Sequence, residues 1–226
     1  MRTHTEHFET VVVGAGQAGL SVGYHLARRD RPFLILNEQA RVGDHWRANW
    51  DTLQLYTPAG YDALPGMRFP ADRWTFPTKD QMGDYLEAYA RRFDLPVRSG
   101  TRVQRLVADG EGGYLVMTSA GPVHADKVVV ATGTFGHTPY VPDLAADLDP
   151  RILQLHSSQY RRPAQLRPGP VLVVGASHSG ADIAFEVAPG TGRCCPGASR
   201  GSFPCGSRAV PPIWPSRPCS SSPGTC

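Results

Sequence analysis

The sequence predicts an α/β fold in which a parallel sheet, extended by a β-meander, is followed by a second, incomplete unit of the same kind. A glycine-rich turn occurs twice, as GAGQAG at 14–19 and as GASHSG at 175–180. Each turn directly follows a β-branched run and precedes a stretch with apolar residues at helical spacing. Three strand-like runs lie between the two turns. This order of strand, turn and helix is typical of Rossmann-like nucleotide-binding domains.

The composition is that of a globular protein, and 226 residues can form one large or two small domains. The formal net charge is +3, but four of the 23 Lys and Arg residues lie in the stretch that begins at Pro189. The rest of the chain carries 19 Lys and Arg against 20 Asp and Glu. A nearly neutral body predicts no nucleic-acid partner.

The amino-terminal stretch MRTHTEHFETVVVGAGQAGL has a polar leader and a short apolar run that glycines interrupt. A signal peptide needs a longer apolar segment after a basic start, and a membrane-spanning helix needs about 20 apolar residues. We therefore expect a cytoplasmic protein that has no membrane partner.

The first glycine turn has the spacing needed to hold a pyrophosphate. Gly14 permits a tight turn, Gly16 lets the main chain approach the phosphates, and Gly19 lets the helix pack close to the strand. The phosphates would accept from free N–H groups at the start of the helix. The predicted phosphate-binding residues are Gly14, Gly16, Gln17, Ala18 and Gly19.

The second predicted strand, PFLILNE, closes a βαβ unit of the expected length. Such units usually end their second strand with an acidic residue that binds a ribose hydroxyl. Asn37 occupies that place here and Glu38 follows it. Because an amide can also bind a hydroxyl, both residues are candidates for the adenosine site. We favour dinucleotide binding over a purely structural glycine turn.

The stretch after the second strand, RVGDHWRANW, resembles the flavin-containing monooxygenase-like flavoproteins, a group that includes the Baeyer–Villiger monooxygenases. In that group a Gly-x-x-Trp-Arg segment lies along the flavin, and Gly43, Asp44, Trp46 and Arg47 match it. Trp would cover an aromatic ring, and Arg would offer fixed donors to an anionic or carbonyl oxygen. The alternative is that Trp46 is simply a buried side chain in a surface loop.

A helix is predicted in the middle of the chain, where Thr78 and Gln81 fit a capping box. Its apolar stripe, Met82, Tyr85, Leu86 and Tyr89, is expected to lie in the core. The runs TRVQRLVAD, GGYLVMTSA and PVHADKVVVATG then predict a β-meander. The continuous apolar run at 128–131 predicts a buried strand that returns to the parent sheet.

The resemblance extends to the end of that strand. Ala131, Thr132 and Gly133 match an ATG segment that lies close to the FAD pyrophosphate in the family, and the resemblance adds Val103 to the cofactor-binding positions. This second match favours FAD over NAD as the ligand of the first unit. An intact relative would pass hydride from NADPH to FAD and then electrons to oxygen or another acceptor, acting on a small-molecule substrate.

The second glycine turn is the NADPH site that the resemblance implies. Its residues are Gly175, Ser177, His178, Ser179 and Gly180, with Ser177 in place of the middle glycine. The expected domains are residues 1–150 for FAD, residues 151–188 for a partial NAD(P) domain, and residues 189–226 for a disordered, irregular tail. The matched stretch covers residues 8–188.

Two segments depart from the family pattern. The segment before the second turn matches the family's F-x-G-x-x-x-H-x-x-x-W motif only at His156 and Tyr160, because Pro150 and Ile152 stand where Phe and Gly would be. His156 is therefore either a working or a structural histidine. Near LQLYTP, the amine-oxidising relatives carry an Asn where this chain has Tyr56 and Thr57. No catalytic residue is assigned.

All five cysteines lie between Cys194 and Cys226, in a Pro-, Gly- and Ser-rich stretch that has no acidic residue. The stretch lacks paired Cys-x-x-Cys spacing, which argues against a disulfide framework or a zinc site, so we expect no metal. It also lacks helical or strand periodicity. We interpret it as a frameshifted tail that leaves the second unit without its next strand, which raises the alternative of a non-catalytic FAD-binding protein.

Overall fold

The computed structural model describes residues 6–133, 139–191 and 194–196. The chain divides into two compact units, Met1–Pro168 and Gly169–Cys226. Across the described ranges, no helix is both long enough and apolar enough to cross a membrane.

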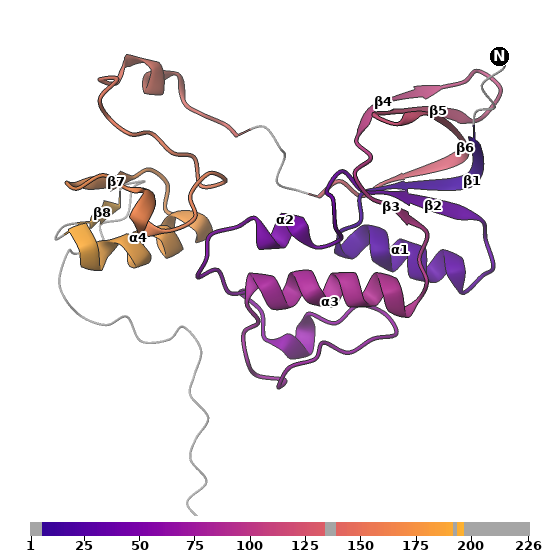
Figure 1. Ribbon diagram of the computed structural model, residues 1–226, viewed down its shortest axis with the longest axis horizontal. Coiled ribbons are helices and arrows are strands. Elements are labelled where there is room, and N and C mark those ends of the chain that lie inside the picture. Colours follow the sequence, from indigo (N-terminus) through magenta and orange to yellow (C-terminus); the bar gives the residue numbers. More distant parts are fainter. Residues whose placement is uncertain (1–5, 134–138, 192–193, 197–226) are drawn as a thin grey trace, which may run out of the picture. The chain divides into compact units, whose positions relative to one another are not determined.

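The first unit is built on a six-stranded sheet with the order β3-β2-β1-β6-β5-β4 (Figure 1). Its strands are β1 (Glu6–Val13), β2 (Phe33–Leu36), β3 (Val97–Arg98), β4 (Val103–Ala108), β5 (Tyr114–Thr118) and β6 (Gly121–Val130). β1 lies between β2 and β6 and pairs in parallel with both. The order reverses at β1, and open α/β sheets bind ligands at such a point.

The predicted meander is confirmed by the antiparallel pairing of β4 with β5 and of β5 with β6. Strand β6 changes partner along its length. Its first residues, 121–125, pair with β5. Residues 123–125 and 127–130 pair with β1. β6 therefore does return to the parent sheet, as its apolar run predicts.

The expected burial of that run is wrong, because Val128, Val129 and Ala131 are only partly buried and Val130 is 65% exposed. Side chains alternate along a strand, so Val130 lies on the same face as Val128, which packs against the cluster that includes Val116 and Val123. β5 pairs with β6 only as far as Ala125. Among the described residues, the meander thus covers the start of β6 and stops short of Val130.

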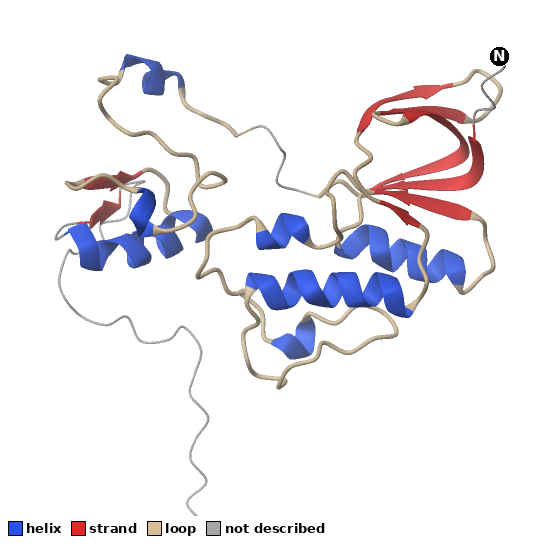
Figure 2. Cartoon of the chain, viewed as in Figure 1, coloured by secondary structure: helices blue, strands red, loops and turns tan. Residues whose placement is uncertain are grey.

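The helices of the first unit are α1 (Gln17–Ala27), the single turn α2 (Asp44–Arg47) and α3 (Lys79–Arg92) (Figure 2). Short 3-10 turns occur at Ala59–Tyr61, Asp143–Asp147 and Pro163–Gln165. In Figure 1, α1 and α3 lie side by side beneath the sheet, while β4 and β5 curl above it. The sheet is therefore covered on one face by helices and on part of the other by its own meander.

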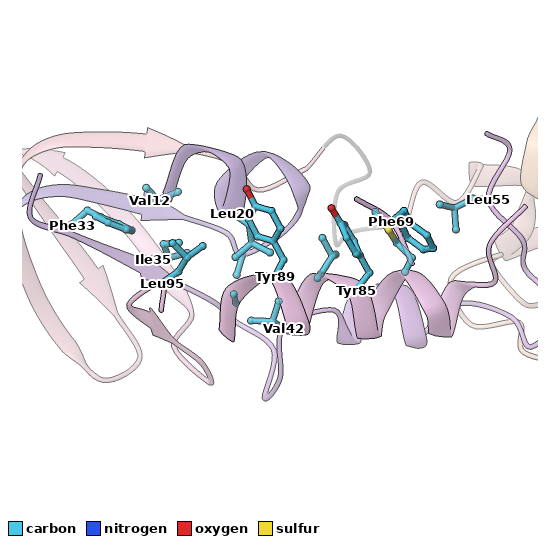
Figure 3. Close-up of a cluster of buried hydrophobic side chains, with 14 of the residues drawn as sticks. Val12, Leu20, Phe33, Ile35, Val42, Leu55, Phe69, Tyr85, Tyr89 and Leu95 are labelled. Atoms are coloured by element: carbon cyan, nitrogen blue, oxygen red, sulfur yellow. The ribbon is translucent and has the colours of Figure 1, made fainter. Parts of the chain in front are cut away.

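The core between the sheet and α3 contains the whole predicted stripe. Met82, Tyr85, Leu86 and Tyr89 are all buried, and in Figure 3 the Tyr89 ring lies near Leu20 while the Tyr85 ring lies near Phe69. Burial raises the pKa of both tyrosines, and their hydroxyls are satisfied by the main chain. Tyr85 Oη donates to Met67 O at 2.8 Å and Tyr89 Oη donates to Pro65 O at 2.6 Å. These bonds tie the 64–67 loop to α3.

The predicted capping box at the start of α3 is confirmed. Gln81 N donates to Thr78 Oγ1 at 3.2 Å, and Thr78 N donates to Gln81 Oε1 at 2.9 Å. Each side chain satisfies a main-chain N–H group that a helix start leaves without an acceptor.

We expect Thr78→Ala to lower the free energy of unfolding by about 1 kcal/mol, because it removes the acceptor for Gln81 N. Chemical denaturation of the variant beside Thr52→Ala, which changes an exposed loop threonine, measures this difference. Equal losses in the two variants would contradict a stabilising role for the cap.

The second unit contains β7 (Val171–Val173), α4 (His178–Thr191) and β8 (Cys194–Pro196), with β8 parallel to β7. The expectation of an irregular chain from Pro189 onward is wrong for its first residues. α4 continues through Pro189 as far as Thr191. Strand pairing joins main-chain groups and needs no side-chain periodicity, so Cys194–Pro196 can pair despite their composition. The remainder of the predicted tail, 197–226, lies outside the described residues.

Candidate functional site

The first predicted turn lies where the carboxyl ends of three strands meet. Gly14 N donates to Leu36 O, at the end of β2, at 2.8 Å. Ala131 N, just after β6, donates to Val13 O at 2.8 Å. The GAGQAG turn and the ATG segment, which are more than 100 residues apart in sequence, are therefore neighbours, as the sequence analysis expects.

Two glycines of this turn are required by the protein itself. Gly14 has a φ of +108°, and a Cβ placed there would lie 2.3 Å from Ala131 O. A Cβ on Gly19 would lie 1.8 Å from Gly14 O. Gly14 therefore lets the turn approach the main chain that follows β6, and Gly19 lets α1 pack closely on the turn after β1.

Gly16 is different, because the protein leaves space beside it. A Cβ on Gly16 would approach no protein atom closer than His45 Cε1, at 3.9 Å. Gly16 is the N-cap of α1, makes no side-chain capping bond, and is followed by no acidic residue in the first turn. The N–H groups of Gln17 and Ala18 donate to no acceptor among the described residues. Open space and free donors at a helix start suit a phosphate group.

His45 is a site residue that the sequence analysis missed. It belongs to the matched GDHWR segment, but it stands at a position that the family motif leaves open. The structure brings its ring next to Gly16, 29 residues earlier in the chain, through the packing of α2. No local pattern marks such a contact.

The adenosine-side candidates lie at the end of β2. Asn37 is buried, and its Nδ2 donates to Gln39 O at 3.0 Å and to Ser99 Oγ at 3.4 Å. Oδ1 is thus the side-chain atom left to accept from a hydroxyl. Glu38 is more exposed and lies 3.7 Å from the guanidinium of Arg102. The start of β4, with Val103, therefore lies near the end of β2.

The GDHWR segment forms α2, and its close approach to α3 depends on glycine. Gly43 has a φ of +88°, and a Cβ there would lie 2.3 Å from Gly83 O of α3. Trp46 packs against the main core cluster, and its buried Nε1 has no hydrogen-bond partner among the described residues. The partly buried ring is thus compatible both with a tryptophan that lies along the flavin and with a tryptophan that is simply a buried side chain.

The sequence analysis expects Arg47 to offer fixed donors to an anionic or carbonyl oxygen, and in the structure its two terminal nitrogens donate to such oxygens of the protein itself. Its Nη1 donates to Val42 O at 3.0 Å and to Asp44 Oδ1 at 2.9 Å. Its Nη2 donates to Asp84 Oδ1 at 2.8 Å and to Glu87 Oε2 at 3.1 Å. With 17% of the side chain exposed, this guanidinium ties α2 to α3.

The same network alters the titration of Glu87. The hydrogen bond from Arg41 and the positive charges of Arg41 and Arg47 lower the pKa of this carboxyl below its ordinary value of 4.5. A lowered pKa in the folded state means that the ionised carboxyl stabilises the fold. That stabilisation is complete above the ordinary value and is lost as the pH falls through the folded-state value.

We therefore expect Glu87→Gln to melt at a lower temperature than the wild-type chain near neutral pH. The difference should shrink as the pH is lowered below about 4.5, where the wild-type carboxyl takes up its proton. Thermal melts across this range measure it. A difference that stays constant with pH would show that the charge of Glu87 contributes nothing.

The second glycine turn repeats the geometry of the first. Gly175 has a φ of +109°, and a Cβ on Gly180 would lie 2.0 Å from Gly175 O. Ala181 N donates to Ser177 O at 2.9 Å, as Leu20 N does to Gly16 O at 3.0 Å in the first turn. α4 begins at His178, so His178 and Ser179 form its first turn. Ser177 occupies the place of Gly16.

His156 is held in a local turn. Ser158 N donates to His156 Nδ1 at 3.2 Å, and His156 N donates to Gln159 Oε1 at 2.9 Å. Tyr160, the other matched residue of that motif, is buried. These contacts favour the structural alternative for His156.

A cavity of about 580 Å³ lies beside α3, away from the glycine turn. Its lining includes Arg41, Phe69, Tyr85 and Arg91, and none of the predicted cofactor-binding residues.

The ATG segment is described as far as Gly133, which has a φ of +85°.

Comparison with known proteins gives a consistent result. The sequence profile of the pyridine nucleotide-disulphide oxidoreductase family matches residues 11–193. An uncharacterized CzcO-like oxidoreductase of Geobacillus kaustophilus is 45% identical over 179 residues, which cover 79% of this chain and 51% of that protein. The indole-3-pyruvate monooxygenase YUCCA1 of Oryza sativa subsp. japonica is 34% identical over 180 residues, which cover 78% of this chain and 44% of that protein.

Among solved structures, a flavin-containing monooxygenase from Stenotrophomonas maltophilia is similar with a TM-score of 0.73 and 33% identity. The similarity covers 83% of this chain and 56% of that one. The chain thus spans about half the length of the relatives that it matches.

Proposed function

The chain belongs to the pyridine nucleotide-disulphide oxidoreductase family, and from this premise we propose that its first unit binds FAD and its second unit binds NADPH. FAD would accept hydride from NADPH and deliver electrons to oxygen or to another acceptor. Flavin monooxygenases among the similar proteins support this reaction class.

The observation that carries the proposal is the space that the protein leaves beside Gly16. Gly14 and Gly19 shape the turn, Gly16 leaves room beside it, and the N–H groups of Gln17 and Ala18 lack acceptors among the described residues. A pyrophosphate would fill that room and accept from those donors. The residues present therefore fit a dinucleotide.

The other candidate residues surround this turn. Asn37 Oδ1 or the Glu38 carboxylate would accept from a ribose hydroxyl at the end of β2. Trp46 would lie along the flavin ring, and its buried Nε1 is one donor that the described residues leave unused. In the second unit, Gly175 and Gly180 would shape the turn that holds the NADPH pyrophosphate.

The test is a titration of the apo form of the full chain with FAD, followed by anaerobic addition of NADPH and, in parallel, NADH. We expect a yellow complex with a flavin spectrum that NADPH bleaches. A chain that gives no saturable change with FAD would contradict the proposal. FAD binding without reduction by either nucleotide would favour the non-catalytic alternative.

A further inference from the structure

α2 is a single turn, and a helix of four residues is not stable by itself in water. It nevertheless carries Trp46, and it brings the ring of His45 next to Gly16. The conformation of this turn therefore determines part of the wall that faces the proposed phosphate site. Side-chain contacts must hold it.

Most of the contacts that satisfy the carbonyls of α2 come from the residues that follow it. Ala48 N donates to Asp44 O at 2.8 Å. Asn49 Nδ2 donates to His45 O at 3.0 Å and to Trp46 O at 3.1 Å, and Asn49 N also donates to Trp46 O at 3.1 Å. The last carbonyl, that of Arg47, accepts from Lys79 Nζ at 2.9 Å. Lys79 is 32 residues away in sequence and is the first residue of α3.

Lys79 is only 6% exposed, so its ammonium group has given up most of its water. Its other hydrogen bond is to Asp80 Oδ1 at 2.9 Å, and the Asp80 side chain is 61% exposed. A cation at a helix carboxyl end also interacts favourably with the partial negative charge there. Lys79 therefore acts as a C-terminal cap for α2 supplied by another helix.

The link between the two helices is reciprocal. Arg47 reaches from α2 to Asp84 and Glu87 on α3, while Lys79 reaches from α3 to the main chain of α2. Gly43 and Gly83 allow the two elements to approach closely enough for both contacts. Two cationic side chains, pointing in opposite directions, thus fix α2 on α3.

We propose that Lys79 is a positioning residue for FAD: it holds the turn that carries His45 and Trp46 in the conformation to which the cofactor binds. This inference rests on the proposed function. It concerns a side chain that touches the main chain of the turn and none of the predicted cofactor-binding side chains.

The test uses the full chain and compares Lys79→Met with Lys79→Arg. Lys79→Met leaves the Arg47 carbonyl without its donor, and we expect the dissociation constant for FAD to rise about tenfold or more. Lys79→Arg keeps a cationic donor and should recover most of the affinity. Lys127→Met is the matched control, because Lys127 is 66% exposed and pairs with Glu9 across β1 and β6.

Two further measurements separate positioning from general stability. In apo Lys79→Met, amide hydrogen exchange should accelerate within residues 43–49 more than in α1. Asp80→Asn should change the FAD dissociation constant by less than about threefold, because an exposed ion pair contributes little. The circular dichroism of bound flavin should differ between Lys79→Met and the wild type.

The inference would be overturned if Lys79→Met melted at a lower temperature but bound FAD with the affinity and the spectrum of the wild-type chain. If Lys79→Met does not fold, Lys79→Gln, which keeps a neutral donor, takes its place under the same criteria. A wild-type chain that fails to bind FAD would instead contradict the proposed function, and the inference would fall with it. The two failures are therefore distinguishable.

Discussion

Gly16→Val is expected to abolish FAD binding while leaving the first unit folded. The φ of Gly16 is −83°, which a valine can adopt, and the nearest protein atom lies 3.9 Å from its would-be Cβ. The Cβ would therefore strike no protein atom, and the branched side chain would extend into the space proposed for the pyrophosphate. We expect the dissociation constant to rise by about 100-fold or more, a loss of about 2.7 kcal/mol of binding free energy.

Gly19→Val is the matched control, because it places the same side chain three residues later. A Cβ there meets Gly14 O at 1.8 Å, so the fold itself must yield. We expect a loss of about 3 kcal/mol or more in the free energy of unfolding. Flavin titration and chemical denaturation of both variants measure the contrast. Gly16→Val that retains FAD would remove this turn from the proposed site.

Gly180→Val is expected to remove NADPH binding from the second unit and to leave FAD binding unchanged. Its Cβ would lie 2.0 Å from Gly175 O, so the turn before α4 could not keep its shape. We expect the NADPH dissociation constant to rise by at least about tenfold, because a phosphate needs the turn's N–H groups held in place. FAD affinity should persist, because the proposed FAD residues belong to the other unit.

Ser177→Gly serves as its control. It restores the glycine that the motif usually carries at this place, and it creates no contact with the protein. We expect it to bind NADPH at least as well as the wild-type chain. Isothermal titration with NADPH measures both variants. Unchanged NADPH affinity in Gly180→Val would show that the second unit is not the nicotinamide nucleotide site.

The parts of the fold that were predictable are those with local signatures. The turn glycines, the capping box of Thr78 and Gln81 and the apolar stripe of α3 each depend on spacings of a few residues. Backbone sterics and helix geometry impose those spacings wherever the segment lies. The structure accordingly confirms the meander, the return of β6 and the burial of Tyr85 and Tyr89.

The errors arose where the outcome depends on a distant partner. The Val130 side chain is exposed because the pairing of β5 with β6 ends at Ala125, which no property of the VVVA run indicates. Cys194–Pro196 pair with β7 through main-chain groups, which composition does not reveal. The partners of Arg47 on α3 lie 37 and 40 residues further along the chain.

The sequence by itself determined that the chain contains two strand–turn–helix units, each with a glycine turn of the same spacing, because glycine at fixed spacing is a local steric requirement. The tertiary structure decided what surrounds the first turn. It placed His45 beside Gly16, paired Arg47 with two carboxylates of α3, and capped α2 with Lys79. Hydrogen bonds and ion pairs between side chains depend on which elements pack together, and that packing is a property of the whole core.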